Sequence, residues 1–352
     1  MKMNKIYQDL VNLAGPSGYE DAVRKYVKDY FLEITDNVVL DKIGGVAAIK
    51  KGKEGAPVFM ICGHMDEVGL LITGVTDRGM LKVHALGQIM PEVLYSQQVE
   101  IHTKKGIIRG VIGSVPPHLG GNKEKKPEIS DFLVDIGADN KEEVQKIGVM
   151  PGDFAVFVNN YTELKDGSRI VSKAWDDRWG LGLTMEIFKE LFNEDLDCTL
   201  ICAASVQEEV GLRGAGTLAQ MLKPDFFLAL DASPVKGAKS TSNAYGELGK
   251  GFLLRLQDPA NIKLPGIKDF FIEVAEKNKI KYQDFFSKGS TDAAKALISN
   301  NGILATTLGL PARYIHSTSI IIDTNDHFQA KAMVRELVLA FNQKSLKQIR
   351  GF

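Results

Sequence analysis

The chain has 352 residues, a formal net charge of −1 and an ordinary composition, with 44% apolar and 25% charged residues. This length is sufficient for two domains with a substantial core, and the balanced charge gives no overall field that would attract nucleic acid or an anionic membrane. No window approaches the roughly 18 consecutive apolar residues of a membrane-spanning helix, so we expect neither nucleic acid nor a membrane as a partner.

Two helices are predicted at the N-terminus. Apolar residues at helical spacing indicate one amphipathic helix over residues 6–13 and a second over residues 23–31. Ser17 and Glu20 have the spacing of a capping box, in which the two side chains bond to main-chain amides at the start of a helix. We therefore expect this pair to begin the second helix.

A central strand is predicted next. Residues 57–62 are apolar at consecutive positions, as expected for a strand that helices cover on both faces. Two shorter strands, 38–40 and 46–49, precede it. His64 and Asp66 follow the apolar run, so polar groups are expected at the carboxyl end of this strand.

The pattern changes between residues 69 and 164. Short segments of alternating apolar and polar residues are separated by turns such as 76–79 and 104–106, a pattern typical of an antiparallel barrel or sandwich. We predict a β-rich, barrel-like insert over 69–164. It would interrupt a catalytic domain formed by residues 1–68 and 165–352.

Helices and strands alternate in the second half of the chain. Such alternation indicates an α/β fold with a mixed, mainly parallel sheet and helices on both faces. The predicted strands are 199–206, 226–230 and 303–308, and the predicted helices are 181–191, 218–222, 267–277 and 326–341.

The cysteines bear on the cellular compartment. Cys198 and Cys202 share one predicted strand and would lie about 13 Å apart, too far for a disulfide. The sequence has no CxxC pair, and its N-terminus lacks the apolar segment of a signal peptide. We therefore expect a cytoplasmic protein with reduced thiols, in which His, Asp and Glu would have to hold any metal.

Two adjacent carboxylates, Glu208 and Glu209, follow the apolar run 199–206. An ionised carboxylate is costly to bury unless it is paired or bound to a metal. Neighbouring side chains on an extended backbone point in opposite directions, so the two glutamates cannot easily do the same job. This favours one metal ligand and one proton-transferring base.

Other potential ligands stand where predicted strands end. His64, Glu209 and Asp231 each follow or finish an apolar run, and the carboxyl ends of parallel strands meet at one crevice. Asp176 and His316 lie in predicted loops. Two imidazoles and three carboxylates suit Zn²⁺, Co²⁺ or Mn²⁺. They are too many for one catalytic site with an open position, and they fit two cations that share a bridging carboxylate.

Simpler explanations exist for the same residues. Acidic residues often follow strands because loops are polar, and Asp176 or Asp177 could cap the helix that follows. His118 could reach the site from the insert, or it could be exposed to solvent. The paired glutamates could also belong to a glycoside hydrolase, although that function leaves His64 and His316 without a role. A non-catalytic scaffold is the third alternative.

Five motifs, in this order, resemble those of a known family: His-x-Asp at 64–66, Trp-Asp-Asp-Arg at 175–178, Gln-Glu-Glu-Val-Gly-Leu-Arg-Gly-Ala at 207–215, Leu-Asp-Ala-Ser-Pro at 230–234 and Arg-Tyr-Ile-His-Ser at 313–317. The family is that of the dinuclear metallo-aminopeptidases, which includes the bacterial glutamyl aminopeptidases and the tetrahedral (TET) peptidases. The resemblance extends over nearly the whole chain and includes residues 114–119 and 287–292.

The resemblance implies a zinc-peptidase-like fold, two divalent metal ions per subunit and an assembly of twelve subunits through the insert. It implies that Glu208 is the general base and later the general acid, and that Asp66 orients the first metal-binding histidine. The metal ligands that it implies are His64, Asp176 as the bridge, Glu209, Asp231 and His316.

The resemblance also bears on the substrate, a peptide with a free N-terminus. Trp175 and the Leu-Pro-Gly segment at 264–266 are most similar to the glutamyl aminopeptidase branch, which implies a preference for N-terminal Glu or Asp. Such a preference would need a cation in the first side-chain pocket. Lys288 and Arg255 are candidates, although each could be an ordinary salt-bridge partner. Neutral or leucine-type specificity with the same metal chemistry is the alternative.

Overall fold

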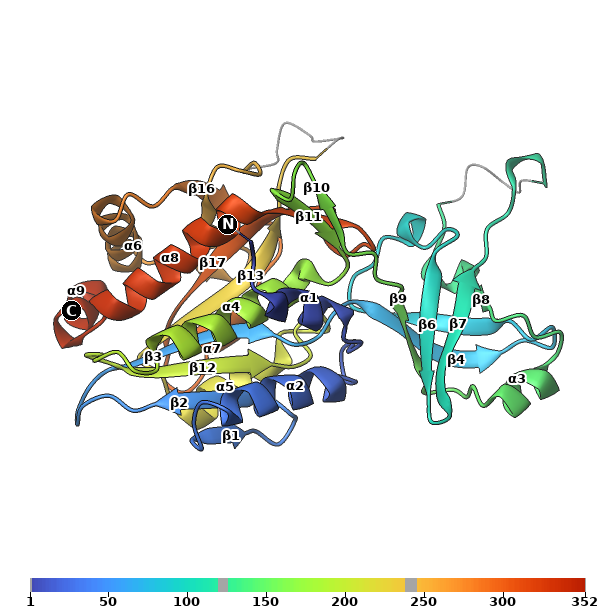
Figure 1. Ribbon diagram of the computed structural model, residues 1–352, viewed down its shortest axis with the longest axis horizontal. Coiled ribbons are helices and arrows are strands. Elements are labelled where there is room, and N and C mark those ends of the chain that lie inside the picture. Colours follow the sequence, from blue (N-terminus) through green and yellow to red (C-terminus); the bar gives the residue numbers. More distant parts are fainter. Residues whose placement is uncertain (1, 120–125, 238–245, 352) are drawn as a thin grey trace.

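The computed structural model describes residues 2–119, 126–237 and 246–351. It consists of a large body built on a mixed sheet and a smaller β-barrel beside it (Figure 1). The chain leaves the large body after β3 (Val58–His64), forms the barrel and returns at β10 (Thr162–Leu164) and β11 (Arg169–Ser172).

Four parallel strands form the middle of the sheet, and antiparallel strands flank them. The parallel strands, in spatial order, are β12 (Thr199–Ser205), β3, β13 (Phe226–Pro234) and β17 (Leu304–Arg313). β1 (Val38–Leu40) and β2 (Val46–Lys50) extend one side, and β18 (Ile320–Asp323), β11 and β10 extend the other. β14 (Phe252–Asp258) also pairs with β17, and it carries β15 (Asn261–Ile262) and β16 (Tyr282–Phe286).

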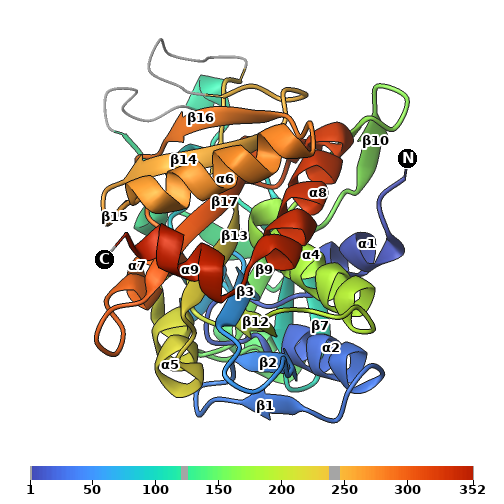
Figure 2. The same cartoon turned by 90° about the vertical axis from the view of Figure 1, so that its left-hand side faces the viewer.

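Helices cover both faces of the sheet (Figure 2). One face packs against α4 (Trp175–Leu191), α1 (Lys5–Asn12), α2 (Asp21–Leu32), α6 (Pro265–Lys277), α8 (Thr324–Ala340) and α9 (Gln343–Arg350). The other face packs against α5 (Arg213–Leu222) and α7 (Asp292–Leu297). Side chains of β3 alternate between these two cores, with Phe59 and Ile61 in the first and Met60 and Cys62 in the second. This alternation explains why the strand is apolar at consecutive positions.

The barrel is closed and has its own core, which consists largely of Val, Leu and Ile side chains. Its strands, in spatial order, are β4 (Gly69–Val75), β5 (Leu81–Leu86), β8 (Leu133–Asp135), β7 (Gly106–Ile112), β6 (Gln98–Thr103) and β9 (Phe154–Phe157). The short elements of this region are α3 (Lys141–Ile147), η1 (Pro91–Val93), η2 (Pro117–Leu119) and η3 (Ile129–Asp131).

The predicted α/β fold with a barrel-like insertion is confirmed, and the predicted capping box is wrong. α2 begins at Asp21 and has no side-chain cap. Ser17 instead donates its hydroxyl to Asp66 Oδ2 at 2.5 Å, and Glu20 Oε1 accepts the main-chain amide of Gln207 at 3.0 Å. Glu20 Oε1 also accepts the amide of Gly18 at 2.9 Å, so each side chain has a partner in a distant segment and neither caps an amide of α2.

The described residues include no helix that is long and apolar enough to cross a membrane. The three cysteines are free and buried.

Candidate active site

Ligand-type side chains meet at one edge of the sheet. His64 is the last residue of β3, and Asp231 lies in the neighbouring strand β13. Glu208 and Glu209 follow β12, whose Ser205 stands opposite His64 in the parallel pairing. The carboxyl ends of three adjacent parallel strands therefore bring these groups to the same crevice.

Two more candidates approach from other segments. His316 follows β17 and has a left-handed backbone, with φ of 57°. Asp176 lies at the start of α4, two residues after Ala174, which is also left-handed, with φ of 56°. Residues other than Gly rarely adopt this conformation, which turns the chain sharply. All five predicted ligands thus lie together, although they come from five segments.

His64 lies at the centre of the cluster. Its Nε2 atom is 3.3 Å from Asp176 Oδ1 and 3.9 Å from Glu208 Oε2. Its Nδ1 atom is 2.9 Å from the main-chain oxygen of Asp66 and 3.4 Å from Asp66 Oδ1. A proton on Nδ1 would bond to Asp66 and leave Nε2 free for a cation, which is the usual arrangement of a metal-binding histidine.

Asp176 faces both histidines of the cluster. Its Oδ2 atom is 3.3 Å from His316 Nε2, which is also 3.4 Å from Glu209 Oε2. The other oxygen of Glu209, Oε1, is buried and has no hydrogen-bond partner among the described residues. Because an unpaired buried carboxylate is costly, the donor set fits a bound cation.

Among the residues that the structure describes, two groups could hold a metal ion. Within each group, one ligand atom per residue lies within 4.8 Å of the others. The groups are His64 with Asp176 and Glu209, and His64 with Glu208 and Asp231.

The electrostatics of the cluster reflect its crowded negative charge. Burial raises the pKa of Glu208 and of Asp231, and it raises the pKa of Glu209 to about 8. For His316, burial disfavours the charged form, but the carboxylates of Asp176 and Glu209 outweigh this effect and raise its pKa to about 9. A divalent cation would replace these shared protons and neutralise the charge.

Asp66 holds the backbone that carries both glutamates. Its Oδ1 atom accepts the amide of Glu208 at 3.0 Å, and its Oδ2 atom accepts the amide of Glu209 at 3.1 Å. The same Oδ2 accepts the Ser17 hydroxyl. Asp66 therefore contacts His64 and also fixes the direction of the chain after β12.

The two acidic residues at the start of α4 differ in their contacts. Asp177 Oδ1 accepts the amide of Gly180 at 2.8 Å, which is a capping bond within the helix. Its Oδ2 accepts the amide of His64 at 3.2 Å. Asp176 instead faces the histidines. The capping alternative therefore describes Asp177, while Asp176 belongs to the cluster.

Asp292 is a member of this region that the sequence did not single out. It is buried at the start of α7, and its Oδ2 atom accepts the Ser205 hydroxyl. Its Oδ1 atom is buried without a partner in the described part of the chain. The pKa of Glu208 is raised mainly by burial, and the negative charges of Asp231 and then of Asp292 raise it further. The sequence signal for Asp292 was its place in the family-like segment 287–292.

A buried ion network lies behind the cluster. Glu67 accepts hydrogen bonds from Lys173 Nζ at 2.7 and 2.5 Å through its two oxygens. Its Oε1 atom also accepts Arg178 Nη2 at 3.4 Å and the amide of Gly15 at 3.3 Å. All three charged side chains are buried. The network joins the segment after His64 to the segment that carries Asp176.

A pocket of about 450 Å³ opens beside the cluster. Arg255 lines it and is buried, with Nη2 donating to Ser233 Oγ at 2.7 Å and Nη1 to the main-chain oxygen of Gly289 at 3.1 Å. Lys288 also lines it and is exposed. His118 is exposed in η2 and is not among the described residues that line this pocket.

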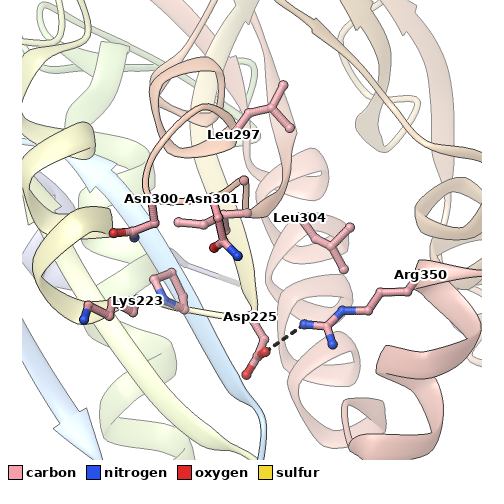
Figure 3. Close-up of a pocket in the computed structure, with 10 residues that line it drawn as sticks. Lys223, Asp225, Leu297, Asn300, Asn301, Leu304 and Arg350 are labelled. Atoms are coloured by element: carbon pink, nitrogen blue, oxygen red, sulfur yellow. Dashed lines mark hydrogen bonds and ion pairs between the residues drawn. The ribbon is translucent and has the colours of Figure 1, made fainter. Parts of the chain in front are cut away.

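A larger cavity, of about 910 Å³, lies at the opposite edge of the sheet (Figure 3). It is close to the amino ends of β13 and β17, and Arg350 donates to Asp225 within it at 2.9 Å. Its lining among the described residues includes no histidine. Because open α/β sheets bind ligands at the carboxyl ends of their strands, we assign the functional site to the smaller pocket.

The fold and this site define an α/β hydrolytic enzyme whose His and carboxylate groups could hold divalent cations. A family model described as M42 glutamyl aminopeptidase matches residues 44–333. The chain therefore belongs to the M42 aminopeptidase family and is a peptidase. The resemblance inferred from the five motifs is thereby confirmed.

Two relatives match over nearly their whole length. The glutamyl aminopeptidase of Lactococcus lactis subsp. cremoris is 36% identical over 97% of this chain and 98% of its own. The lysyl aminopeptidase of Pyrococcus furiosus is 33% identical over 95% of this chain and 97% of its own. Similar sequences in this family thus carry names that differ in the preferred N-terminal residue.

Solved structures of the same architecture include TET peptidases. The TET aminopeptidase of a marine sediment Thaumarchaeota archaeon superposes with a TM-score of 0.94 at 32% identity, covering 98% of this chain and 99% of that chain. The TET1 peptidase of Pyrococcus horikoshii, which can assemble into a tetrahedron or a large octahedral shell, gives a TM-score of 0.86 at 32% identity, covering 96% of this chain and 99% of that chain.

Proposed function

We propose that the chain is a metal-dependent aminopeptidase that uses two divalent cations per subunit, Zn²⁺ or Co²⁺ or alternatively Mn²⁺, to hydrolyse the N-terminal peptide bond. The observation that carries this proposal is that Asp176 lies between two histidines, with one oxygen 3.3 Å from His64 Nε2 and the other 3.3 Å from His316 Nε2. The unpartnered buried oxygen of Glu209 supports it, because a carboxylate in that position needs a cation.

The distances suggest how the ligands would be divided. The two oxygens of Asp176 face different histidines at 3.3 Å each, as a bridging carboxylate would. His64 and Asp231 would complete one metal position, and Glu209 and His316 the other. When bound, such cations polarise the scissile carbonyl and make a water molecule acidic enough to supply a nucleophile near neutral pH.

Glu208 would be the general base and then the general acid. It is buried, and burial raises its pKa, so it can accept the proton of the attacking water and return it to the leaving amine. Asp66 would hold Glu208 in place through its main-chain amide. Proton transfer of this kind usually contributes about 10²–10⁴-fold to the rate.

The preferred N-terminal residue is proposed to be Glu or Asp. Arg255 lines the pocket and is buried; its Nη1 atom is 3.5 Å from the buried carboxylate of Asp258, and its Nε atom has no hydrogen-bond partner among the described residues. A buried guanidinium with a free donor is suited to bind a carboxylate. Lys288 could add a second positive charge at the pocket mouth. Neutral or leucine-type specificity with the same chemistry is the alternative.

A glycoside hydrolase is not favoured. Its two carboxylates would have to flank a sugar, whereas Glu208 and Glu209 are adjacent and are directed at different histidines, at 3.9 and 3.4 Å. Two histidines among the carboxylates have no role in that chemistry.

Residues 1–68 and 165–352 are proposed to form the catalytic unit, and residues 69–164 the unit for dimerisation and assembly, except that β10 at the end of this range pairs with β11 in the sheet of the catalytic unit. Exposed apolar side chains on the barrel, such as Ile107 and Leu119, support a contact with other subunits. By analogy with the Pyrococcus horikoshii TET1 peptidase, the assembly would be a tetrahedron of twelve chains. The free, buried cysteines are consistent with a reducing, cytoplasmic location.

The test is a panel of aminoacyl p-nitroanilides assayed after chelation and reloading with Zn²⁺, Co²⁺ or Mn²⁺. We expect activity to disappear on chelation, to return with a metal, and to be highest on Glu and Asp substrates. Arg255→Leu should lower kcat/KM for Glu substrates far more than for Leu substrates. Equal rates on leucine and lysine substrates would refute the acidic preference, and full activity in chelator would refute the metal mechanism.

A further inference from the structure

One turn of the barrel reaches the ligand cluster. β5 ends at Leu86, and the next two residues, Gly87 and Gln88, lead towards η1. Gln88 lines the pocket beside the cluster, together with Glu209 and His316. A segment of the insert is therefore part of the wall of the site.

Gly87 lies against Glu209 with no room for a side chain. Its φ is +86°, and a Cβ atom there would be 3.1 Å from Glu209 Cβ and 3.3 Å from Glu209 Oε2. It would also be 2.9 Å from Val68 Cγ1. Glu209 Oε2 is the oxygen that lies 3.4 Å from His316 Nε2. A methyl group at position 87 would therefore press against Val68 and against Glu209, and the carboxylate that faces the histidine would have to shift by a few tenths of an ångström.

The residue after Gly87 is Gln88, and it contacts His316, which is proposed to share a metal position with Glu209. The main chain of Gln88 lies against the imidazole of His316, and both residues line the pocket. Contacts with main-chain groups orient metal-binding histidines. His64 differs, because its partner Asp66 is only two residues away on the same segment.

We propose that the Gly87–Gln88 turn of the barrel is a positioning element for one of the two metal positions, the one formed by Glu209 and His316. This inference rests on the proposed two-metal function. The other position, with His64 and Asp231, is built on the adjacent strands β3 and β13. Displacement of the turn should therefore weaken one metal position and spare the other.

The test compares Gly87→Ala with Gly137→Ala. Gly137 also lies in the barrel with positive φ, +77°, but a Cβ atom there would meet nothing within 4 Å. It therefore carries the same backbone strain without the contact. Chelated full-length protein is titrated with Co²⁺ in a calorimeter. We expect two equivalents in the wild type and in Gly137→Ala. In Gly87→Ala, one equivalent should keep its affinity and the second should bind at least tenfold more weakly.

The outcomes separate this inference from the proposed function. Two equivalents with wild-type affinity in Gly87→Ala would overturn the role of the turn, as would equal weakening in Gly137→Ala. Fewer than two equivalents in the wild type would instead overturn the two-metal function.

A second measurement needs no variant. Hydrogen exchange of wild-type amides at 86–90 should slow when Zn²⁺ is added, whereas exchange at 135–139 should not. Unchanged exchange at 86–90 would contradict the proposal.

Discussion

Asp66 shows how one buried side chain sets the geometry of two others. Its oxygens accept the amides of Glu208 and Glu209, so these neighbouring residues leave β12 on a fixed backbone. On that backbone the side chains diverge, one towards His64 at 3.9 Å and the other towards His316 at 3.4 Å. The geometry allows the two glutamates to have different tasks, which their adjacency in the sequence suggests.

Because Glu208 is proposed as the base and Glu209 as a metal ligand, replacing each one should affect metal content and turnover differently. Glu208→Gln should keep both metal ions and lose about 10²–10⁴-fold in kcat, because it removes the base but no ligand. Glu209→Ala should lose one metal ion per subunit. Metal content and single-substrate kinetics on both variants check this, and each variant serves as the control for the other. Near-normal turnover in Glu208→Gln would rule out its role as base.

At the scale of elements, the site depends on how closely α4 packs against β3. Gly63, next to His64, allows this approach, because a Cβ atom there would lie 2.4 Å from the Leu181 amide nitrogen and 2.5 Å from the Gly180 carbonyl carbon. Both contacts are with helix backbone, which cannot move aside as a flexible side chain can. The strand that ends in His64 and the helix whose first turn carries Asp176 are thereby held at a fixed separation.

Gly63→Ala should therefore destabilise the protein by about 1–3 kcal/mol through overpacking. Gly74→Ala in β4 is the matched control, because its nearest contact would be Lys82 Cδ at an ordinary 3.7 Å. Its effect should stay within about 0.5 kcal/mol. Urea unfolding of chelated protein measures both changes, and equal effects would contradict the packing argument.

The local pattern of apolar and polar residues predicted the helices and strands well. Where a prediction from this pattern was wrong, contacts between distant segments explain the difference. The strand predicted over 199–206 is apolar at consecutive positions because helices cover both of its faces. The two glutamates that follow it indicated the cluster of ligand-type side chains. Ser17 and Glu20 had capping-box spacing, but Ser17 bonds to a residue 49 positions away, and Glu20 bonds to one 187 positions away as well as to nearby Gly18. Asp292 was marked only by its place in the family-like segment 287–292, and Gly87 by nothing in the sequence, because the importance of both comes from what the fold places beside them.

At the scale of the whole molecule, both the barrel and the catalytic body expose single apolar side chains, and those of the barrel bear on assembly. Ile107, Val115 and Leu119 are 59%, 67% and 69% exposed, far more than the side chains of the barrel's own core. Apolar groups exposed to this extent on one small domain indicate a contact with another protein surface. This supports the barrel as the unit of assembly.

The assembled protein should have a mass twelve times that of the 38.6 kDa chain. Ile107→Asp should lower this mass, because it would bury a charge in the proposed contact. Ile298→Asp on the catalytic body, where Ile298 is 71% exposed, should leave it unchanged. Light scattering after size-exclusion chromatography distinguishes these results, and a monomeric wild type would exclude the assembly.

The buried ion pair of Glu67 and Lys173 affects how well the protein can tolerate insertions and deletions in the barrel. The pair closes a ring of more than a hundred residues, and the whole barrel lies within that ring. The entropy of closing a ring depends weakly on its length, at about 0.6 kcal/mol for each doubling. Residues can therefore be added to or lost from the barrel's outer loops at little thermodynamic cost to the catalytic body. Such a chain can acquire a new assembly geometry while its chemistry stays the same.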